Sequence, residues 1–136
     1  MANIIRFDVA LLGAVVGFLW GDFDGLLLAL ISFIALDYLT GILVAIAEKR
    51  LSSSVGFSGI ARKGVILAVV AVGHIVDVYV LGGCGAVFRS AVIGFYLANE
   101  GMSILENAGR LGMPLPRKLK EVLRQLEDES ENEEED

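Results

Sequence analysis

The sequence predicts an all-α integral membrane protein with three to four transmembrane helices, followed by a short amphipathic helix and a disordered acidic tail. The chain of 136 residues is 55% hydrophobic and has a mean hydropathy of +0.68. One stretch, Gly25–Ala47, carries a single formal charge and is long enough to cross a hydrocarbon core of roughly 30 Å as a helix. Further apolar runs at Gly64–Leu81 and Ala86–Leu105 exclude a single buried helix in a soluble domain.

Charge is distributed unevenly along the chain. The net charge is −6, but eight of the ten residues in Glu127–Asp136 are acidic, so the remainder is slightly basic. Clustered like charges repel one another, and we therefore expect this tail to be disordered. Cys84 is the only cysteine, which excludes an intramolecular disulfide, and no Cys/His spacing typical of a zinc site occurs. The sequence indicates no metal site and no cofactor.

The first predicted segment, residues 1–24, holds a weak membrane or interfacial helix and a turn. Residues Asn3–Trp20 have a short apolar core, and Arg6 and Asp8 lie near one end. Because an Arg side chain can reach the headgroups from there, the segment is compatible with a transmembrane helix and with an interfacial one. Trp20 would lie at the membrane interface, with a tight turn after it.

The transmembrane core is predicted at residues 25–108 and begins with Gly25–Ala47. Asp37 lies near the middle of this span, where an ionisable group costs a few kcal/mol unless it faces protein or water. Asp37, Thr40 and Gly41 recur at helical spacing and share one face. We expect that face to meet another helix or a pore. Asp37 has two interpretations. Its carboxyl group either hydrogen-bonds within the subunit, or it takes part in oligomer contact or pore lining.

The next segment, Glu48–Lys63, is predicted to be a cytoplasmic loop. Short loops rich in Lys and Arg stay on the cytoplasmic side of a membrane. The expected basic contacts in this loop are Lys49, Arg50, Arg62 and Lys63. Gly56-Phe57-Ser58-Gly59 is similar to the GxxG loop of RNA-binding domains, but no surrounding pattern of helices and strands supports that interpretation. We therefore expect no nucleic-acid partner.

A return across the membrane is predicted at Gly64–Leu81, which has enough residues for a span. His74 and Asp77 lie three positions apart on one face, so their side chains can pair in a low-dielectric setting. A pair satisfied across helix interfaces is the favoured interpretation. A proton-relay role is the alternative, since His titrates near neutral pH. Two ligands on one helix are too few for a metal site.

A second, weaker span is predicted at Ala86–Leu105, after a turn on the far side of the membrane. Gly94, Ala98 and Gly101 recur at helical spacing and are typical of close helix packing. Other positions of the same helix are polar, namely Asn99, Glu100, Ser103, Asn107 and Arg110. A helix with one small face and one polar face is suited to line a pore or an interface, although a helix leaving the membrane would show the same pattern.

A short amphipathic helix is predicted at residues 109–126, after Pro114 and Pro116 end the preceding helix. Its apolar positions are Leu119, Val122, Leu123 and Leu126, and its basic contacts are Arg117, Lys118, Lys120 and Arg124. Basic charge beside an apolar stripe suits the anionic inner leaflet, so the C-terminus is expected to be cytoplasmic. If Asn3–Trp20 spans, there are four helices with the N-terminus inside; otherwise there are three with the N-terminus outside.

Several short motifs follow one another between Asp37 and Leu126. They are Asp37-Tyr38-Leu39-Thr40-Gly41, Leu51-Ser52-Ser53 with Gly56, Gly59-Ile60 and Lys63, then His74 and Asp77, Asn99-Glu100, Ser103-Ile104, Glu106-Asn107, and Leu111-Gly112 with Pro114 and Pro116. In this order and spacing they resemble the toxin-secretion/phage-lysis holins, phage holin family 4. The resemblance implies a small multi-pass protein of the bacterial cytoplasmic (inner) membrane. It also implies a homo-oligomer whose lesions release an endolysin or, in some members, a secreted toxin.

The physical pattern agrees with self-association in a lipid bilayer. Polar groups within a membrane are costly when they face lipid, and a protomer of three or four helices has little interior in which to hide them. Subunits that associate through small-residue faces would turn their polar faces toward water. The alternatives are a small membrane channel or transporter and a non-lytic membrane scaffold. No enzyme is expected, because no catalytic set of residues occurs.

Overall fold

The computed structural model describes residues 1–122 and 124–125, and its named elements are four α-helices and one π-helical turn. In chain order the elements are α1 (Ala2–Trp20), α2 (Gly25–Ala47), α3 (Ser53–Ile75), the π-helix η1 (Val76–Val80) and α4 (Val87–Arg110). None of the described residues forms a strand. The all-α prediction is confirmed, and α2 begins and ends at the predicted residues.

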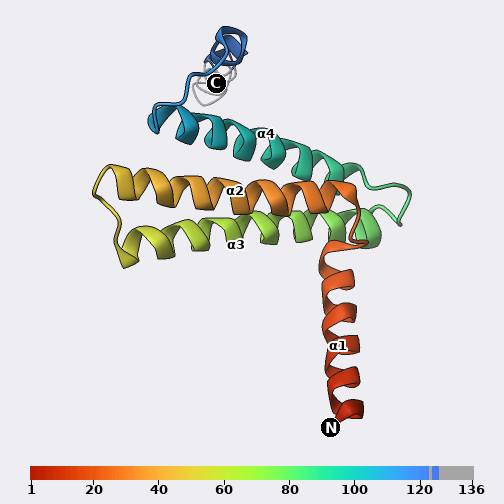
Figure 1. Cartoon of the computed structure of the whole chain (residues 1–136). Coiled ribbons are helices and arrows are strands. Elements are labelled where there is room, and N and C mark those ends of the chain that lie inside the picture. The colour runs from red at the N-terminus through yellow and green to blue at the C-terminus, as the bar shows by residue number, and fades with distance from the viewer. Residues whose placement is uncertain (123, 126–136) are drawn as a thin grey trace.

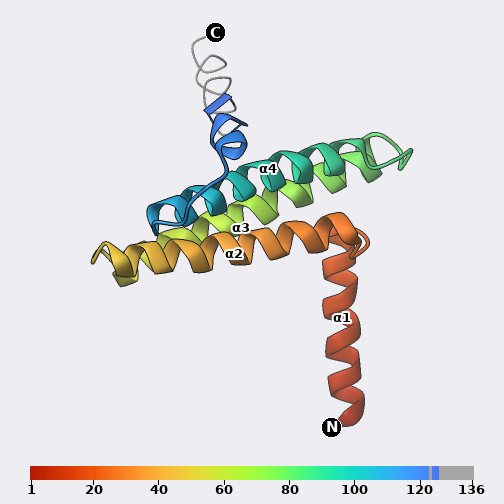
Figure 2. The same ribbon diagram turned by 45° about the horizontal axis from the view of Figure 1, so that its top comes forward.

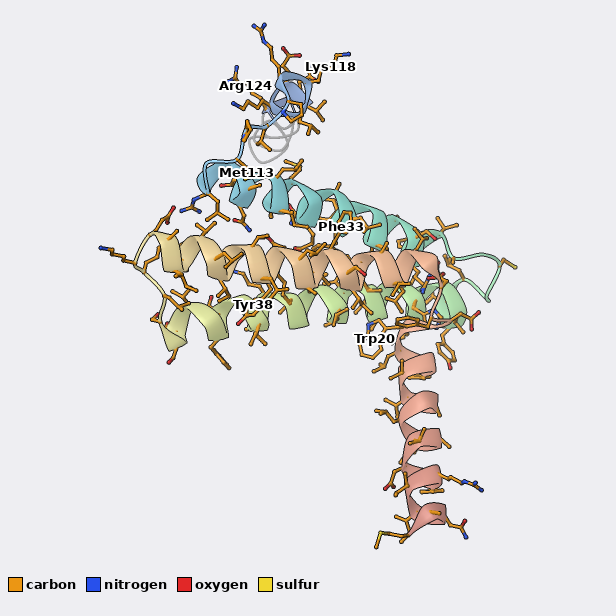
Figure 3. The ribbon with its side chains drawn as sticks, in the orientation of Figure 1. Trp20, Phe33, Tyr38, Met113, Lys118 and Arg124 are labelled. Carbon is orange, nitrogen blue, oxygen red and sulfur yellow. The ribbon has the colours of Figure 1, made fainter. Side chains whose placement is uncertain are left out.

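Helices α2, α3 and α4 lie side by side, whereas α1 projects away from one end of this three-helix bundle (Figures 1 and 2). We call this the α1 end; it also holds η1 and the start of α4. The opposite end, which we call the loop end, holds the connection between α2 and α3 and the last turn of α4. Trp20 joins α1 to the bundle, because its Nε1 donates to the Leu67 carbonyl oxygen of α3 at 2.8 Å (Figure 3).

Side-chain caps mark the starts of α2 and α3. The Asp24 carboxylate accepts the Leu27 N–H at 3.0 Å, and the Ser52 hydroxyl accepts the Val55 N–H at 3.2 Å. Each cap satisfies one of the first amides of a helix, which have no partner within the helix itself. Helix α3 therefore begins directly after Ser52.

The predicted loop Glu48–Lys63 is wrong in its longer part, because residues 53–63 belong to α3. The glycines of this stretch bring α3 close to α2. A Cβ at Gly59 would lie 3.1 Å from the ring of Tyr38, whose hydroxyl donates to the Gly56 carbonyl oxygen at 3.4 Å (Figure 3). This packing outweighs the low helix propensity of Ser and Gly. The GxxG stretch is thus a helix contact.

An apolar core fills the region where α2, α3 and α4 meet. Its buried members are Leu27, Leu30, Ile34, Ile66, Val70 and Ile93, with Trp20 packed against them. Three of these side chains, Leu30, Val70 and Ile93, are fully buried. Because lipid tails are as apolar as a Leu side chain, such a core stabilises a membrane bundle mainly through close packing.

Three of the described helices are long and apolar enough to cross a membrane: Ala2–Trp20, Gly25–Ala47 and Ser53–Val80, the last of which combines α3 and η1. The predicted fourth span, Ala86–Leu105, is helical but is not among them. Polar residues within α4, Glu100 among them, lower its hydropathy below that of the other helices. Helix α4 lies in the bundle by virtue of its contacts with α2 and α3.

Helix α1 buries none of its residues. Its apolar side chains are largely exposed, as Phe7 and Leu12 illustrate at 68% and 64%. Contacts with the bundle come from its C-terminal end, where the rings of Phe18 and Tyr79 have centroids 5.8 Å apart. Apolar surface of this extent is typical of a helix that is covered by lipid or by another protein.

After α4 the chain is again helical at residues 117–122 and 124–125, within the segment of the expected amphipathic helix. Two of its predicted apolar positions, Leu123 and Leu126, lie outside the described residues. The predicted disordered tail, Glu127–Asp136, also lies outside them.

Candidate functional site

An ion cluster joins the three helices of the bundle. Lys63 of α3 forms ion pairs with Asp37 of α2 and with Glu100 of α4, and its Nζ lies 2.6 Å from Glu100 Oε2. The side chain of Glu100 is only 3% exposed. Two carboxylates share one ammonium, so the formal charge of the cluster is −1. Buried charges are tolerated only when they are paired. The charged residue that each helix contributes to the ion cluster is therefore stabilised by charged residues of the other helices.

Asn107 of α4 extends the ion cluster toward the loop end. Its Nδ2 donates to Asp37 Oδ1 at 3.1 Å and to Thr40 Oγ1 at 2.9 Å. A Cβ at Gly41 would lie 3.8 Å from the same nitrogen, so Gly41 leaves room for the amide. The face of α2 that carries Asp37, Thr40 and Gly41 thus meets α4 of the same chain.

Glu48 joins the connection between α2 and α3 to the end of α4. Its carboxylate accepts from Arg50 Nε at 2.8 Å and from Arg110 Nη2 at 2.8 Å. The Arg50 guanidinium, and then that of Arg110, holds the pKa of Glu48 below its ordinary value. All three side chains are more than a third exposed, so this contact orders the loop end and contributes little to stability.

A pocket of about 490 Å³ opens between α2, α3 and α4 at the loop end. Its wall comes from the second half of α2, the first half of α3 and the second half of α4. The charged side chains that line it are Asp37, Arg50, Arg62, Lys63, Glu106 and Arg110, and its hydroxyl groups include those of Ser54, Ser58 and Ser103. A polar pocket beside a buried ion cluster is the candidate binding site of the described part of the chain.

At the α1 end, Asp77 caps α4 from a different element. Its Oδ1 accepts the Phe88 N–H at 3.0 Å and its Oδ2 accepts the Arg89 N–H at 2.8 Å. Helix α4 has no side-chain acceptor at its own N-cap position, because the residue there is Ala86. Asp77 is 2% exposed, so without these two N–H groups its carboxylate would be buried and unpaired.

The predicted pair between His74 and Asp77 does not form: both residues lie in the described part of the chain, and no hydrogen bond or ion pair joins them. Asp77 lies in the π-helix, whose wider turn changes its direction relative to His74. The His74 ring lies instead against Gly21, where a Cβ would be 2.7 Å from Cε1.

Arg89 holds the turn between α1 and α2. Its Nε donates to the Trp20 carbonyl oxygen at 2.8 Å, and its Nη2 donates to the Asp22 carbonyl oxygen at 2.9 Å. The guanidinium also contacts the Asp24 carboxylate at 2.8 and 3.1 Å. The Arg89 hydrogen bond, followed by the Leu27 N–H, holds the pKa of Asp24 below its ordinary value. The sequence analysis did not predict this contact. The residue that could have indicated it is Arg89 itself, a charged side chain within an otherwise largely apolar segment.

The small-residue stripe predicted on α4 has two different surroundings. Gly101 faces α2, where a Cβ would lie 3.3 Å from the ring of Phe33 (Figure 3). Gly94 and Ala98 are exposed, and nothing lies within 4 Å of a Cβ at Gly94. Phe95 beside them is 66% exposed. We call the surface formed by Gly94, Phe95 and Ala98 the outer face of α4.

The remaining predicted residues lie on the surface or at the pocket. Asn99 is exposed and Ser103 is half-buried in the pocket wall. Lys63, predicted as a cytoplasmic contact, belongs to the ion cluster, whereas its neighbour Arg62 is exposed, because successive helix residues point in different directions. The other predicted basic contacts are all exposed: Lys49, Arg50, Arg117, Lys118, Lys120 and Arg124.

The apolar helices and the charged contacts between them define a small multi-pass membrane protein. The chain belongs to the bacteriophage holin family, whose model matches residues 14–128, and the predicted resemblance is confirmed. It is 42% identical to an uncharacterized 14.9 kDa protein of Clostridium perfringens, over 91% of this chain and 93% of that one. It is 44% identical to an uncharacterized protein of Listeria monocytogenes, over 90% of this chain and 86% of the relative. No solved structure matches the chain.

Proposed function

We propose that this chain oligomerises in the bacterial cytoplasmic (inner) membrane and forms lesions that release an endolysin or a secreted toxin. Membership of the bacteriophage holin family supports a holin-type role. The observation that carries the proposal is the two-sided character of α4. Its polar residues Glu100 and Asn107 contact α2 and α3, while the outer face of α4 is uncovered.

This arrangement supports a route from a closed protomer to an aqueous lesion. Within one chain, the polar side of α4 is satisfied by the ion cluster. Exposed small residues at Gly94 and Ala98 allow the backbones of two helices to approach closely, which favours association of α4 with another subunit. When many subunits associate, water in a lesion can replace the partner charges of Glu100, because charged groups are tolerated where they face water.

The distribution of basic residues supports a cytoplasmic loop end. Lys49 and Arg50 lie in the connection between α2 and α3, and Arg117 and Lys118 follow α4 at the same end of the bundle. Short segments rich in Lys and Arg stay on the cytoplasmic side. In the proposed orientation, the C-terminus is cytoplasmic and the turn between η1 and α4 faces outward.

The proposal is tested by inducing the full chain in a bacterium with and without a cytoplasmic murein hydrolase, while a folded reporter protein is followed in the medium. We expect the cells to lyse and to release the folded reporter when the hydrolase is present, and we expect no lysis without the hydrolase. Ion leakage without reporter release would favour the channel or transporter class instead. Normal growth with the protein in the membrane would favour a scaffold.

A pair of double variants tests whether the outer face of α4 mediates association. Gly94→Leu with Ala98→Leu should delay or abolish reporter release and reduce cross-linked oligomers. The matched control is Gly64→Leu with Ala68→Leu, which places the same side chains on an exposed small pair of α3. Equal oligomer yields for the two double variants would show that the outer face of α4 is not the interface.

A further inference from the structure

We propose that the pocket at the loop end binds a phosphoethanolamine group, which carries a phosphate and a primary ammonium, and that a phospholipid supplies it. This inference goes beyond the proposed function, since it assigns a ligand to a site that lesion formation does not require. The pocket lies between α2, α3 and α4 and has a volume of about 490 Å³, which is within the range of sites for small ligands.

Two charged groups in the pocket wall have no ion-pair partner among the described residues: Arg62 of α3 and Glu106 of α4. Both residues are exposed. The other charges of the wall are engaged, since Lys63 pairs with Asp37 and Glu100, and the two remaining Arg side chains pair with Glu48. The pocket therefore offers one available cation and one available anion.

This charge pattern matches a zwitterion better than a simple anion. A guanidinium donates to phosphate oxygens from a planar fork, which suits Arg62 to the phosphate. A carboxylate accepts hydrogen bonds from a primary ammonium, which suits Glu106 to the amine. For a ligand that carries phosphate alone, Glu106 would be a like charge in the same pocket and would oppose binding.

The first turn of α3 adds to the phosphate side of the pocket. Ser54 lies in this turn and lines the pocket. The N-terminus of a helix carries a partial positive charge and N–H groups without partners in the helix. Together with Arg62, which lies two turns further along α3, this end of the helix favours the negative group of the ligand.

Apolar side chains in the pocket wall favour a lipid as the source of the group. Ile42 of α2 and Val55 of α3 both line the pocket and are half-buried. Acyl chains attached to a headgroup in the pocket would lie against such side chains. A soluble phosphoethanolamine would gain nothing from them.

The test is native mass spectrometry of the purified full chain in detergent with an equimolar mixture of phosphatidylethanolamine, phosphatidylglycerol and phosphatidylcholine of identical acyl chains. We expect the ethanolamine lipid to be retained about fivefold better than either of the others, as one charge-assisted hydrogen bond at an exposed site would give. Phosphatidylcholine carries the same phosphate, but its ammonium has no N–H to donate to Glu106.

Two variants separate the two halves of the site. Arg62→Gln should lower retention of all three lipids, whereas Glu106→Gln should remove only the preference for phosphatidylethanolamine. Their matched controls are Arg117→Gln and Glu121→Gln, which make the same charge changes at exposed positions after α4. Because the four side chains are exposed, none of these changes should unfold the protein.

The proposal is overturned if wild-type protein retains the ethanolamine and choline lipids equally, or if Arg62→Gln behaves like Arg117→Gln. Soluble glycerophosphoethanolamine, which carries the same phosphate diester and ammonium without acyl chains, decides the source of the group. If it displaces the lipid at equal concentration, the headgroup alone accounts for binding and a soluble source suffices. If it does not, the acyl chains contribute and the ligand is a lipid. This readout is independent of lysis, so it can succeed where the proposed function fails.

Discussion

The Asp77 carboxylate accepts the backbone N–H of Arg89 at 2.8 Å, so a residue of the π-helix caps a helix that starts ten residues later. The side chain of Arg89 then binds the carbonyl oxygen of Trp20 and the carboxylate of Asp24. This one relationship joins the end of α3, the start of α4 and the turn that precedes α2.

Removal of the Asp77 carboxylate should destabilise the bundle through the exposed start of α4. Asp77→Ala leaves the N–H groups of Phe88 and Arg89 without an acceptor, and we expect a loss of about 2 kcal/mol in the free energy of unfolding. Asp77→Asn keeps one oxygen acceptor and should lose less. Denaturation in detergent micelles measures both, with Asp8→Ala on exposed α1 as the control. An equal loss for Asp77→Ala and Asp8→Ala would contradict the capping role.

The ion cluster predicts unequal effects for its members. Lys63→Met leaves Asp37 and Glu100 as two shielded carboxylates with no cation, which should cost about 3–5 kcal/mol in the free energy of unfolding. Glu100→Gln leaves a neutral pair of Lys63 and Asp37, and it should cost about 1 kcal/mol or less. The same denaturation assay compares the two variants. A larger loss for Glu100→Gln would show that Lys63 is not the central member.

The crossing of α3 and α4 can be tested with alanine at two glycines of α3. A Cβ at Gly73 would lie 3.3 Å from the Phe88 carbonyl oxygen and 3.4 Å from the Arg89 Cα, both of which are backbone atoms of α4. We therefore expect Gly73→Ala to lower stability despite the higher helix propensity of Ala. Gly64→Ala meets no atom within 4 Å and should raise stability by up to about 1 kcal/mol. If Gly73→Ala were as stabilising as Gly64→Ala, the close contact would be excluded.

Acid should loosen the turn between α1 and α2. The pKa of Asp24 lies below its ordinary value of 3.8 because of the Arg89 hydrogen bond and the Leu27 N–H. A carboxyl group with a depressed pKa contributes its full stabilisation above the ordinary value, and that contribution is lost as the pH falls through the lower, folded-state value. The contact between Asp24 and Arg89 should therefore persist from neutral pH down to 3.8 and weaken below it.

Trp20 reports on this acid transition, because it is the only tryptophan and its carbonyl oxygen accepts from Arg89. Its fluorescence emission should change below pH 3.8 in the wild-type protein. Asp24→Asn has no carboxyl group to titrate at this position, so the change should be absent or much smaller. A transition of the same size and midpoint in both proteins would assign it to another acid.

Residue spacing was sufficient to predict which positions of α2 share the face that carries Asp37. Asp37, Thr40 and Gly41 lie on one face of any α-helix, and in the structure all three lie next to Asn107 of α4. The helix itself was equally predictable, because an apolar stretch as long as Gly25–Ala47 has few alternatives. Spacing could not show which helix that face meets.

Lys63 and Asp77 show where sequence reasoning was insufficient. Composition placed Lys63 in a basic loop, but the packing of Tyr38 against the glycines of α3 makes that stretch helical and brings Lys63 to Asp37. Spacing paired Asp77 with His74, but the π-helix directs Asp77 to the start of α4.

The sequence by itself determined the fold class and the membrane character, because the length and hydropathy of a helix are local properties of the chain. It also determined membership of the bacteriophage holin family. The partners of each buried charge were decided only by the tertiary structure. A charge such as Glu100 is satisfied by a group 37 residues away in the chain, and that distance is closed by the packing of three helices together.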